Sequence, residues 1–563
     1  MNTEHCSVAG NKIRSVVVRQ PARRHPSRKN NLAIISCISK SRNAFLTFVL
    51  KFMRMRYPLI MAVTMLMLAG CSRKEKGPLV EEVSPLFDAS LKPFYHGVAS
   101  GDPLTDRVVI WTRVTPPDSA VSVLVKWEIA EDPAFARLTQ TDLVATTPAR
   151  DYTVKVDVQE LRPGTTYYYR FSALGGFSPI GRTRTLPAQD PDSLKLAVVS
   201  CSNWEFGYFN AYDRIAEKEV DAVLHLGDYI YEYPPGGYGD TTIGRTHLPA
   251  REILSLYDYR TRHAQYRLDQ GLRNMTARHP LVAIWDDHEV ANNSYVTGAE
   301  NHQSPEGDYE QRKTAARQAY YEWLPIREGK HYRSFSYGQL AHVMMLDERL
   351  EGRTRQPETE QDTAYLSARQ SMLGTAQLQW LETDLQKHAT WRIIGNQVIF
   401  SDVQLGAVYP SMPKNLDAWD GYPLEKQKIK NFIVNNKIAN VVFLAGDTHS
   451  AWAIEAATDV AQTYQAATSA GAFAVEFGTT SVSSGNSDEY TTTDTVRMME
   501  ATLLKTNPHI KYVNARDHGY LLVTFTPLRV RADFYRVNTL RQADSGEQLD
   551  RSYAVAVGTN RLQ

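Results

Sequence analysis

Thiol, carboxyl, phenol and imidazole side chains follow four apolar segments of this 563-residue chain. The segments end in the letters VVSCS, HLGDYIYE, IWDDHE and FLAGDTHSA. Their candidate metal ligands are Cys201, Asp228, Tyr231, Asp287, Asp447 and His449. Thiolate and phenolate are strong electron donors that, with imidazole, suit transition metals, whereas carboxylates suit hard cations such as Ca2+. The set therefore predicts a metal centre with both kinds of donor.

Each of these residues alone has an ordinary structural explanation. An Asp after a strand is commonly a turn or helix cap, and a Gly-Asp pair is a common turn sequence. A single His such as His449 is more often a hydrogen-bonded core residue, and Tyr231 could pack as one aromatic among others. The adjacent acids Asp286 and Asp287 are harder to explain, because they repel each other unless a cation or hydrogen bonds compensate. The recurrence at several strand ends is what indicates function.

The pattern of apolar residues predicts the elements that must position these side chains. Buried-type strands alternate with amphipathic stretches such as 310–323 and 374–387. This alternation is typical of a layered α/β domain, in which functional residues gather at the carboxyl ends of the strands. We expect the four strand ends to meet at the same edge of one sheet. Residues 94–187 instead contain short alternating runs separated by Pro and Gly turns, which predicts a small all-β sandwich.

The four blocks resemble those of the calcineurin-like metallophosphoesterases. That family's usual blocks are DxH, GDxxD, GNHD/E and GHxH, and the letters here are SCS, GDYIY, DDHE and GDTH. The departures are similar to the alkaline phosphatase D (PhoD-like) branch, as are HGVASGDP, VIWTRV, AWDGYP and EFGTTSVSSG. The resemblance spans about residues 94–538.

The resemblance implies a layered α/β metallophosphoesterase fold, two β-sheets flanked by helices, preceded by a small all-β sandwich of the fibronectin/Ig-like kind. It also implies Fe3+ bound by Cys201, Asp228, Tyr231 and His449. The neighbouring position offers Asp228 as a bridge together with Asp287 and Asp447, and the resemblance implies Ca2+ there, as one or two ions. Asn292 or Asn293 could complete the calcium shell.

The expected activity is hydrolysis of phosphate monoesters, diesters or both, as in an alkaline phosphatase. Two adjacent cations would hold the phosphate oxygens and activate a water for attack. We expect His288, beside the ligand Asp287, to stabilise or protonate the leaving oxygen. Arg349 follows another apolar strand and either contacts phosphate or is a solvated surface charge.

The N-terminus predicts an exported lipoprotein. Residues 1–56 hold twelve Lys or Arg against one acid, and the apolar run YPLIMAVTMLMLAG follows and ends at Cys71. A basic segment, a short apolar run and a small-residue exit make a secretory signal, and LAGC resembles a lipobox. The alternative is a retained membrane helix, but the run is shorter than the ~20 residues that a bilayer requires. We expect a lipid on Cys71 and a location on the periplasmic side of a bacterial membrane, with the outer membrane favoured.

The expected organisation follows from these boundaries. A start at Met53 or Met55 would give a signal of ordinary length, which predicts that residues 1–52 are a non-native extension. The predicted parts are a signal peptide (53–70), a tether (71–93), the sandwich (94–187), a catalytic domain (188–540) and a C-terminal tail (541–563). Cys201 is the only thiol after Cys71, so no internal disulfide is expected. We expect a monomer.

Three other functions are compared with the phosphatase interpretation. A phosphodiesterase or phospholipase of the same fold, acting on lipid or polymer diesters, would use the same ligands. A surface binding module with a degenerate enzyme domain is disfavoured, because all the expected ligands are present. A nucleic-acid-binding protein is disfavoured, because the chain after residue 70 holds 51 basic and 61 acidic side chains.

Overall fold

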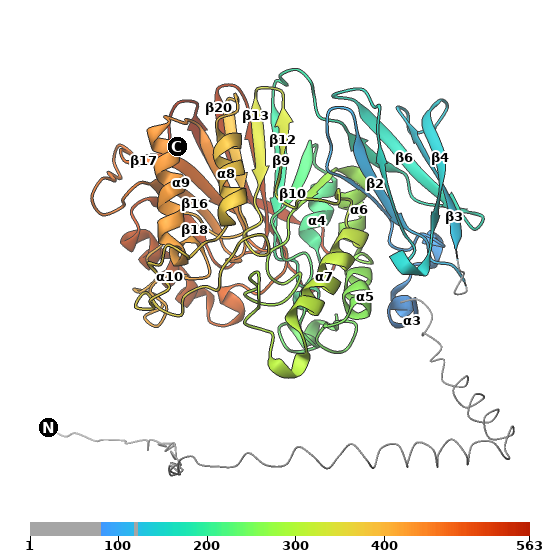
Figure 1. The fold of residues 1–563 in the computed structure, drawn as a ribbon, viewed down its shortest axis with the longest axis horizontal. Helices are drawn as coiled ribbons and strands as arrows, with labels where there is room; N and C mark the ends of the chain where they lie inside the picture. Colours follow the sequence, from blue (N-terminus) through green and yellow to red (C-terminus); the bar gives the residue numbers. More distant parts are fainter. Residues whose placement is uncertain (1–79, 118–121) are drawn as a thin grey trace, which may run out of the picture. The chain divides into compact units, whose positions relative to one another are not determined.

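The computed structural model of this protein describes residues 80–117 and 122–563 (Figure 1). The predictions for the extension, the signal peptide and the lipid on Cys71 lie outside the described residues. Throughout the described part of the chain, no helix combines the length and apolar character needed to cross a membrane.

The largest sheet has nine strands, in the order β21-β20-β19-β9-β10-β11-β1-β2-β5. Its central strands β9, β10 and β11 run parallel, so their carboxyl ends lie at one edge of the sheet. The strands are β1 (Val98–Gly101), β2 (Val108–Arg113), β5 (Thr153–Val158), β9 (Leu194–Val199), β10 (Ala222–His225), β11 (Leu281–Ala283), β19 (Gly519–Phe525), β20 (Arg529–Val537) and β21 (Glu547–Ala556).

A second sheet has seven strands, in the order β12-β13-β14-β15-β17-β16-β18. Strands β13, β14, β15 and β17 are parallel neighbours. The strands are β12 (Arg333–Tyr337), β13 (Ala341–Met345), β14 (Trp391–Gly395), β15 (Val441–Ala445), β16 (Ala451–Ala457), β17 (Ala472–Gly478) and β18 (Ile510–Asn514).

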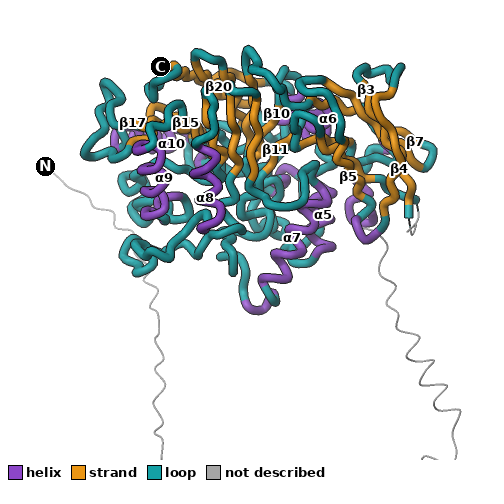
Figure 2. The backbone as a smooth tube through the Cα atoms, turned by 45° about the horizontal axis from the view of Figure 1, so that its top comes forward, coloured by secondary structure: helices purple, strands orange, loops and turns teal. Residues whose placement is uncertain are grey.

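These two sheets pack face to face, and helices cover their outer faces. One apolar core joins Val198 and Leu224 of the first sheet to Ile393 and Leu444 of the second. Figures 1 and 2 show α8 and α9 on one flank and α5 and α7 on the other. The helices are α4 (Asn210–Ala216), α5 (Leu256–Tyr266), α6 (Gln270–Arg278), α7 (Tyr309–Trp323), α8 (Gly374–Leu385), α9 (Pro423–Asn435) and α10 (Thr493–Thr506). The predicted layered α/β fold is confirmed.

The N-terminal sandwich exists, but one of its two layers belongs to the nine-stranded sheet. A third sheet, β4-β3-β6-β7 with β8 paired to β6, packs through Val125 and Phe171 against Ile110 and Val154 of β2 and β5. At the junction, Gly101 of β1 pairs with Leu281 of β11. A Cβ atom on Gly101 would lie 2.4 Å from the Leu281 carbonyl oxygen, so only glycine permits this approach. The strands of the third sheet are β3 (Val123–Ala130), β4 (Leu138–Thr146), β6 (Thr166–Ala173), β7 (Gly176–Phe177) and β8 (Gly181–Arg184).

Two predicted boundaries differ from the structure. Residues 80–93 of the predicted tether are packed against the body, because Val83 is fully buried and the ring of Phe87 stacks on Tyr95 at 4.1 Å. Residues 541–563 of the predicted tail include β21, which pairs along β20. Both segments are rich in polar residues, and that composition hid the few apolar anchors that attach them.

Candidate metal centre

Parallel strands deliver the predicted ligands, but from two sheets rather than one. Cys201 follows β9 and Asp228 follows β10, whereas Asp447 and His449 follow β15 of the second sheet. The expectation of a single sheet edge was wrong, because a strand sequence shows where a ligand stands but not which sheet the strand joins. The face-to-face packing places the carboxyl ends of both sheets at the same end of the domain.

Four side chains form what we call the thiol half of the site: Cys201, Asp228, Tyr231 and His449. Donor atoms of Cys201, Asp228 and His449 all lie within 4.8 Å of one another. The Tyr231 hydroxyl donates to Asp228 Oδ2 at 2.9 Å and lies 3.3 Å from His449 Nε2. Sulfur, oxygen and nitrogen donors therefore converge on one small buried volume.

Backbone strain marks the same residues. Cys201, Asp228, Asp447 and His449 have φ angles of 60°, 53°, 61° and 56°, in the left-handed region that L-residues usually avoid. Each such conformation costs about 1–3 kcal/mol and persists only where the surroundings enforce it. Strained residues cluster at functional sites, so this geometry is independent evidence that the four turns position ligands.

The loop 479–486 forms hydrogen bonds with residues of the thiol half. Ser484 Oγ lies 2.6 Å from the Tyr231 hydroxyl and 2.9 Å from the Cys201 carbonyl oxygen. The Gly485 carbonyl lies 2.9 Å from His449 Nδ1, which leaves His449 Nε2 facing the other donors. The motif EFGTTSVSSG thus has a structural role. It contacts the side chains of Tyr231 and His449 and the backbone turn at Cys201.

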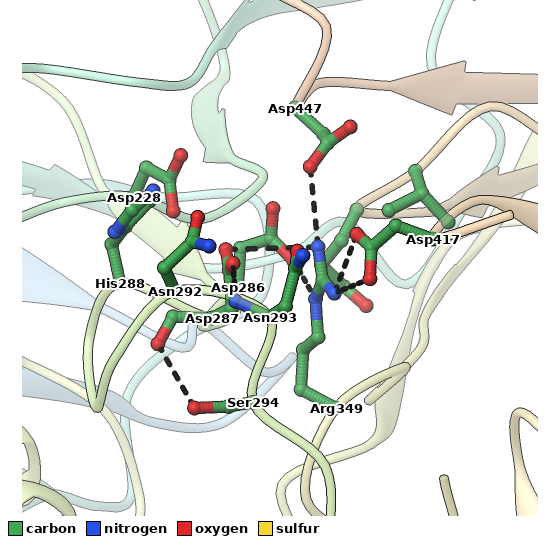
Figure 3. Close-up of polar contacts among 12 residues, drawn as sticks. Asp228, Asp286, Asp287, His288, Asn292, Asn293, Ser294, Arg349, Asp417 and Asp447 are labelled. Carbon is green, nitrogen blue, oxygen red and sulfur yellow. Dashed lines mark hydrogen bonds and ion pairs between the residues drawn. The ribbon is translucent and has the colours of Figure 1, made fainter. Parts of the chain in front are cut away.

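Three acids form what we call the carboxylate half: Asp286, Asp287 and Asp447. Their carboxylate oxygens lie within 4.8 Å of one another. Asp228 groups in the same way with Asp287 and His288, so Asp228 stands between the two halves. Figure 3 shows this arrangement, with the side chains of Asp228 and Asp447 on different sides of the cluster. Asp228 is therefore placed to bridge two cations.

Arg349 is buried among carboxylates rather than solvated. Its guanidinium pairs with Asp286, with both oxygens of Asp417 at 2.9 and 2.8 Å, and with Asp447 at 3.2 Å (Figure 3). The side chain is fully buried, which rules out the solvated surface charge considered from the sequence. A contact between Arg349 and phosphate stays a prediction, since these ion pairs engage its donors in this structure.

Burial shifts the pKa values of groups in both halves. Burial raises the pKa of the Cys201 thiol and the Tyr231 hydroxyl well above their usual values, and the Asp228 carboxylate adds to both shifts. Burial also raises the pKa of Asp447 to about 7 against the opposing effect of Arg349. A bound cation reverses this logic, because a coordinated thiol loses its proton.

The residues present fit a pair of cations. Asp228 Oδ1 and Asp287 Oδ1 are buried and accept no hydrogen bond, although Arg349 lies 3.6 Å from Asp287 Oδ1. A buried carboxylate oxygen that accepts no hydrogen bond is costly. A cation at each half would satisfy these two oxygens. Asn292 and Asn293 lie beside the carboxylate half, where either amide oxygen could join the shell (Figure 3). The donor chemistry differs between the halves as the sequence predicted, with sulfur only in the thiol half.

His288 is held by a buried acid. Its Nδ1 lies 2.7 Å from Glu232 Oε2, and the other oxygen of Glu232 accepts from the Asn292 backbone and the Asn301 amide. Burial alone would lower the pKa of His288, but Glu232, Asp287 and Asp228 raise it well above its usual value. These charges favour the protonated form of His288, whose Nδ1 is engaged by Glu232 and whose ring groups with Asp228 and Asp287.

Sequence reasoning missed Glu232 and Asp417, and it placed Glu289 of the IWDDHE block among the possible ligands without foreseeing its structural role. Glu232 follows the ligand Tyr231 directly, and its place in the GDYIYE block was the available signal. Glu289 accepts backbone N–H groups from Asp286 and Tyr229 at 2.9 and 2.6 Å, which ties two ligand turns together. Asp417 lies one residue before the AWDGYP motif, and nothing in its spacing indicated a pairing with Arg349.

A cavity of about 840 Å3 leads to the carboxylate half. Asn293 and Asp417 belong to its lining, which mixes charged, neutral polar and apolar side chains. The charged residues besides Asp417 are Glu300, Arg355, Glu358, Glu360 and Lys414. The site is thus reachable by a polar ligand.

Comparison with known proteins gives concordant matches. The family model described as PhoD-like phosphatase matches residues 196–534, and the model of the PhoD-like phosphatase N-terminal domain matches residues 82–187. Alkaline phosphatase D of Bacillus subtilis (strain 168) is 39% identical over 483 residues, which are 81% of this chain and 79% of that protein. A solved structure of PhoD is 34% identical, with a TM-score of 0.75, and covers 84% of this chain and 92% of that one.

Proposed function

This chain belongs to the PhoD-like phosphatase family and is a metal-dependent phosphoesterase, and we propose that its thiol half holds Fe3+ and its carboxylate half holds Ca2+, as one or two ions. The observation that carries the proposal is the convergence of the Cys201 thiol, the Tyr231 phenol and the His449 imidazole on Asp228. Thiolate and phenolate suit a trivalent iron, whereas Asp287 and Asp447 offer the oxygen donors that Ca2+ prefers. When bound, the two cations supply charge for the phosphate oxygens and an activated water.

The residues of the chain perform the remaining work. The reaction forms a bond from the attacking water oxygen to phosphorus and breaks the bond from phosphorus to the leaving oxygen. His288 carries the proton that the leaving oxygen needs, and Glu232 keeps its ring oriented. Arg349 compensates the charge of Asp286, Asp417 and Asp447, which keeps these carboxylates together.

The first test is an absorption spectrum together with elemental analysis of the purified protein. A broad charge-transfer band in the visible region, with bound iron and calcium, is the expected result. A colourless protein that holds only zinc or manganese would contradict the assigned metals and leave the phosphoesterase activity intact. Assays with a monoester and a diester then decide which ester class the enzyme prefers.

We also propose that the protein is exported and carries a lipid on Cys71. The support is the LAGC sequence after a short apolar run, preceded by Arg54 and Arg56. Mass analysis of the mature N-terminus tests it: a lipidated Cys71 as the first residue is expected. A mature chain that retains residues 57–70 would contradict the proposal and favour a membrane helix. We propose a monomer, which light scattering checks.

A further inference from the structure

A second cavity, of about 310 Å3, opens beside the carboxylate half and has mainly apolar walls. The candidate ligand Asp447 and its neighbour Thr448 line one end. The apolar residues that line it include Val403, Leu405, Tyr409, Trp452, Leu503 and Val513. Most of these side chains belong to a separate apolar core beneath the cavity. Apolar walls therefore reach directly to a metal-binding turn.

The walls of this cavity are held in place by hydrogen bonds. Trp452 Nε1 donates to Thr448 Oγ1 at 2.8 Å, which fixes the indole to the turn that carries Asp447. On the other side, the Val403 backbone donates to Asp420 at 3.2 Å, and Lys426 pairs with Asp420 at 2.6 Å. The cavity is thus preformed, and a ligand that enters it gains apolar burial at little cost in ordering the protein.

The two cavities beside the centre offer opposite chemistry. Met412 and Asn415 line both of them and form the wall between them. The larger cavity has five charged side chains besides Asp417 among a mixed lining, whereas the smaller one is lined mainly by aliphatic and aromatic side chains, with Asp420 and Asp447 as its charged residues. A phosphorus atom at the carboxylate half would thus have substituents that meet two different environments.

The position of His288 decides which substituent faces the apolar cavity. His288 groups with Asp228 and Asp287, whereas Asp447 groups with Asp286 and Asp287. His288 does not line the apolar cavity, and Figure 3 shows it on a different side of the cluster from Asp447. A leaving oxygen on the His288 side of the cluster would face away from the apolar cavity. The group beside Asp447 is therefore one that stays on phosphorus.

We propose that the apolar cavity is a subsite for an aliphatic or aromatic substituent that remains bonded to phosphorus after hydrolysis. The inference rests on the proposed phosphoesterase chemistry and adds a substrate preference to it. A diester with such a substituent takes up one water, loses the alcohol on the His288 side and yields a phosphate monoester that carries the apolar group. The cavity has about twice the volume of the roughly 150 Å3 cavity known to bind benzene.

A series of 4-nitrophenyl alkyl phosphates tests the subsite, with the alkyl group lengthened from methyl to butyl, hexyl and dodecyl. The leaving group is 4-nitrophenol throughout the series, so differences in kcat/KM report the alkyl group alone. Each buried methylene should raise kcat/KM about fourfold until the cavity is full. A plateau near hexyl indicates a compact group, and a continued rise to dodecyl indicates a lipid chain that extends beyond the cavity. Equal kcat/KM for methyl and hexyl would overturn the subsite.

Two matched variants separate the cavity from general effects. Ala515→Leu fills the cavity from its wall, and Ala501→Leu adds the same atoms at an exposed position of α10. We expect Ala515→Leu to flatten the dependence on chain length while the rate with 4-nitrophenyl phosphate stays within about twofold. Ala501→Leu should retain the full dependence. If Ala515→Leu also retains it, the alkyl group binds elsewhere and the proposal is wrong.

Product binding keeps the subsite testable without turnover. Calorimetric titration of methyl, butyl and hexyl phosphate into the metal-loaded protein should show a Kd that falls with chain length, again about fourfold per methylene. A falling Kd without any hydrolysis would support the subsite and contradict the proposed activity. Normal hydrolysis of 4-nitrophenyl phosphate, together with a Kd that does not change with alkyl chain length, would support the proposed activity and contradict the subsite.

Discussion

The two halves of the candidate metal centre lie side by side, but different interactions hold their side chains together. The thiol half brings together groups that burial keeps neutral, the Cys201 thiol, the Tyr231 phenol and the His449 imidazole, because burial raises the first two pKa values and lowers that of His449. Strained turns and the loop 479–486 hold these groups in place. The carboxylate half brings together like charges and needs Arg349 to keep them close. The comparison teaches that strained backbone geometry positions ligands in both halves, as Asp447 shows, and that only the carboxylate half also needs charge compensation by Arg349.

Removing the shared ligand should have the largest effect, because it tests whether the halves form one centre. Asp228→Asn keeps the size of the side chain and removes the bridging charge. We expect both metals to be lost and hydrolysis to fall below detection. Elemental analysis and a monoester assay measure this. Loss of only one metal would mean that Asp228 belongs to one half alone.

His288→Ala should lower kcat by about 10²–10⁴-fold while both metals remain bound, because it removes the proton donor but no assigned ligand. The expected effect is smaller than that of Asp228→Asn, since the cations still act. Metal content and kcat on the same preparation check it. His302→Ala, at the partly exposed His302, is the matched control. Turnover unchanged in His288→Ala would refute the assigned role.

Cys201→Ser should affect the thiol half selectively. Replacing sulfur with a hydroxyl weakens binding of a transition metal, and we expect iron affinity to fall by roughly 10–100-fold with loss of most of the visible absorption band. Calcium content should stay near that of the wild type, because Cys201 does not reach the carboxylate half. Equal loss of both metals would show that the halves are coupled more tightly than their separate donor sets indicate.

The smallest expected effect comes from Asp417→Asn. Asp417 binds Arg349 with both oxygens but is no member of the candidate ligand groups. Its neutralisation should leave the thiol half unchanged and weaken calcium binding or activity about tenfold, as for other outer partners of metal ligands. Calcium titration followed by activity measures it, with Asp494→Asn on exposed α10 as control. No change would mean that Arg349 is oriented by Asp286 and Asp447 alone.

The convergence of the candidate ligands could be predicted from the sequence, because they follow buried strands and carry distinctive chemistry. Cys201 and Asp287 are examples, since a thiol or a second acid at a strand end has few structural explanations. The distribution of strands between sheets could not be predicted, because buried parallel strands in both sheets are uniformly apolar. Glu232 was missed for a different reason: its role depends on the three-dimensional approach of His288.

Domain boundaries were harder to predict than the site. The continuation of the nine-stranded sheet into the sandwich depends on Gly101, which carries no apolar signal of its own. Strand β21 is an edge strand with mixed polar residues, so its alternation does not reveal it. Packing between segments that are distant in the sequence determines these contacts. The local sequence pattern therefore carries little information about them.

The pairing of β9 with β19 has a consequence for how the enzyme matures. The strand that carries Cys201 to the site has Val198 opposite Leu521, near the far end of the chain. During synthesis, the N-terminal strands emerge first, and β9 stays without this neighbour until residues 519–525 have been made. The thiol half cannot reach its final geometry until almost the whole chain has been made, so metal binding there should be one of the last steps of maturation.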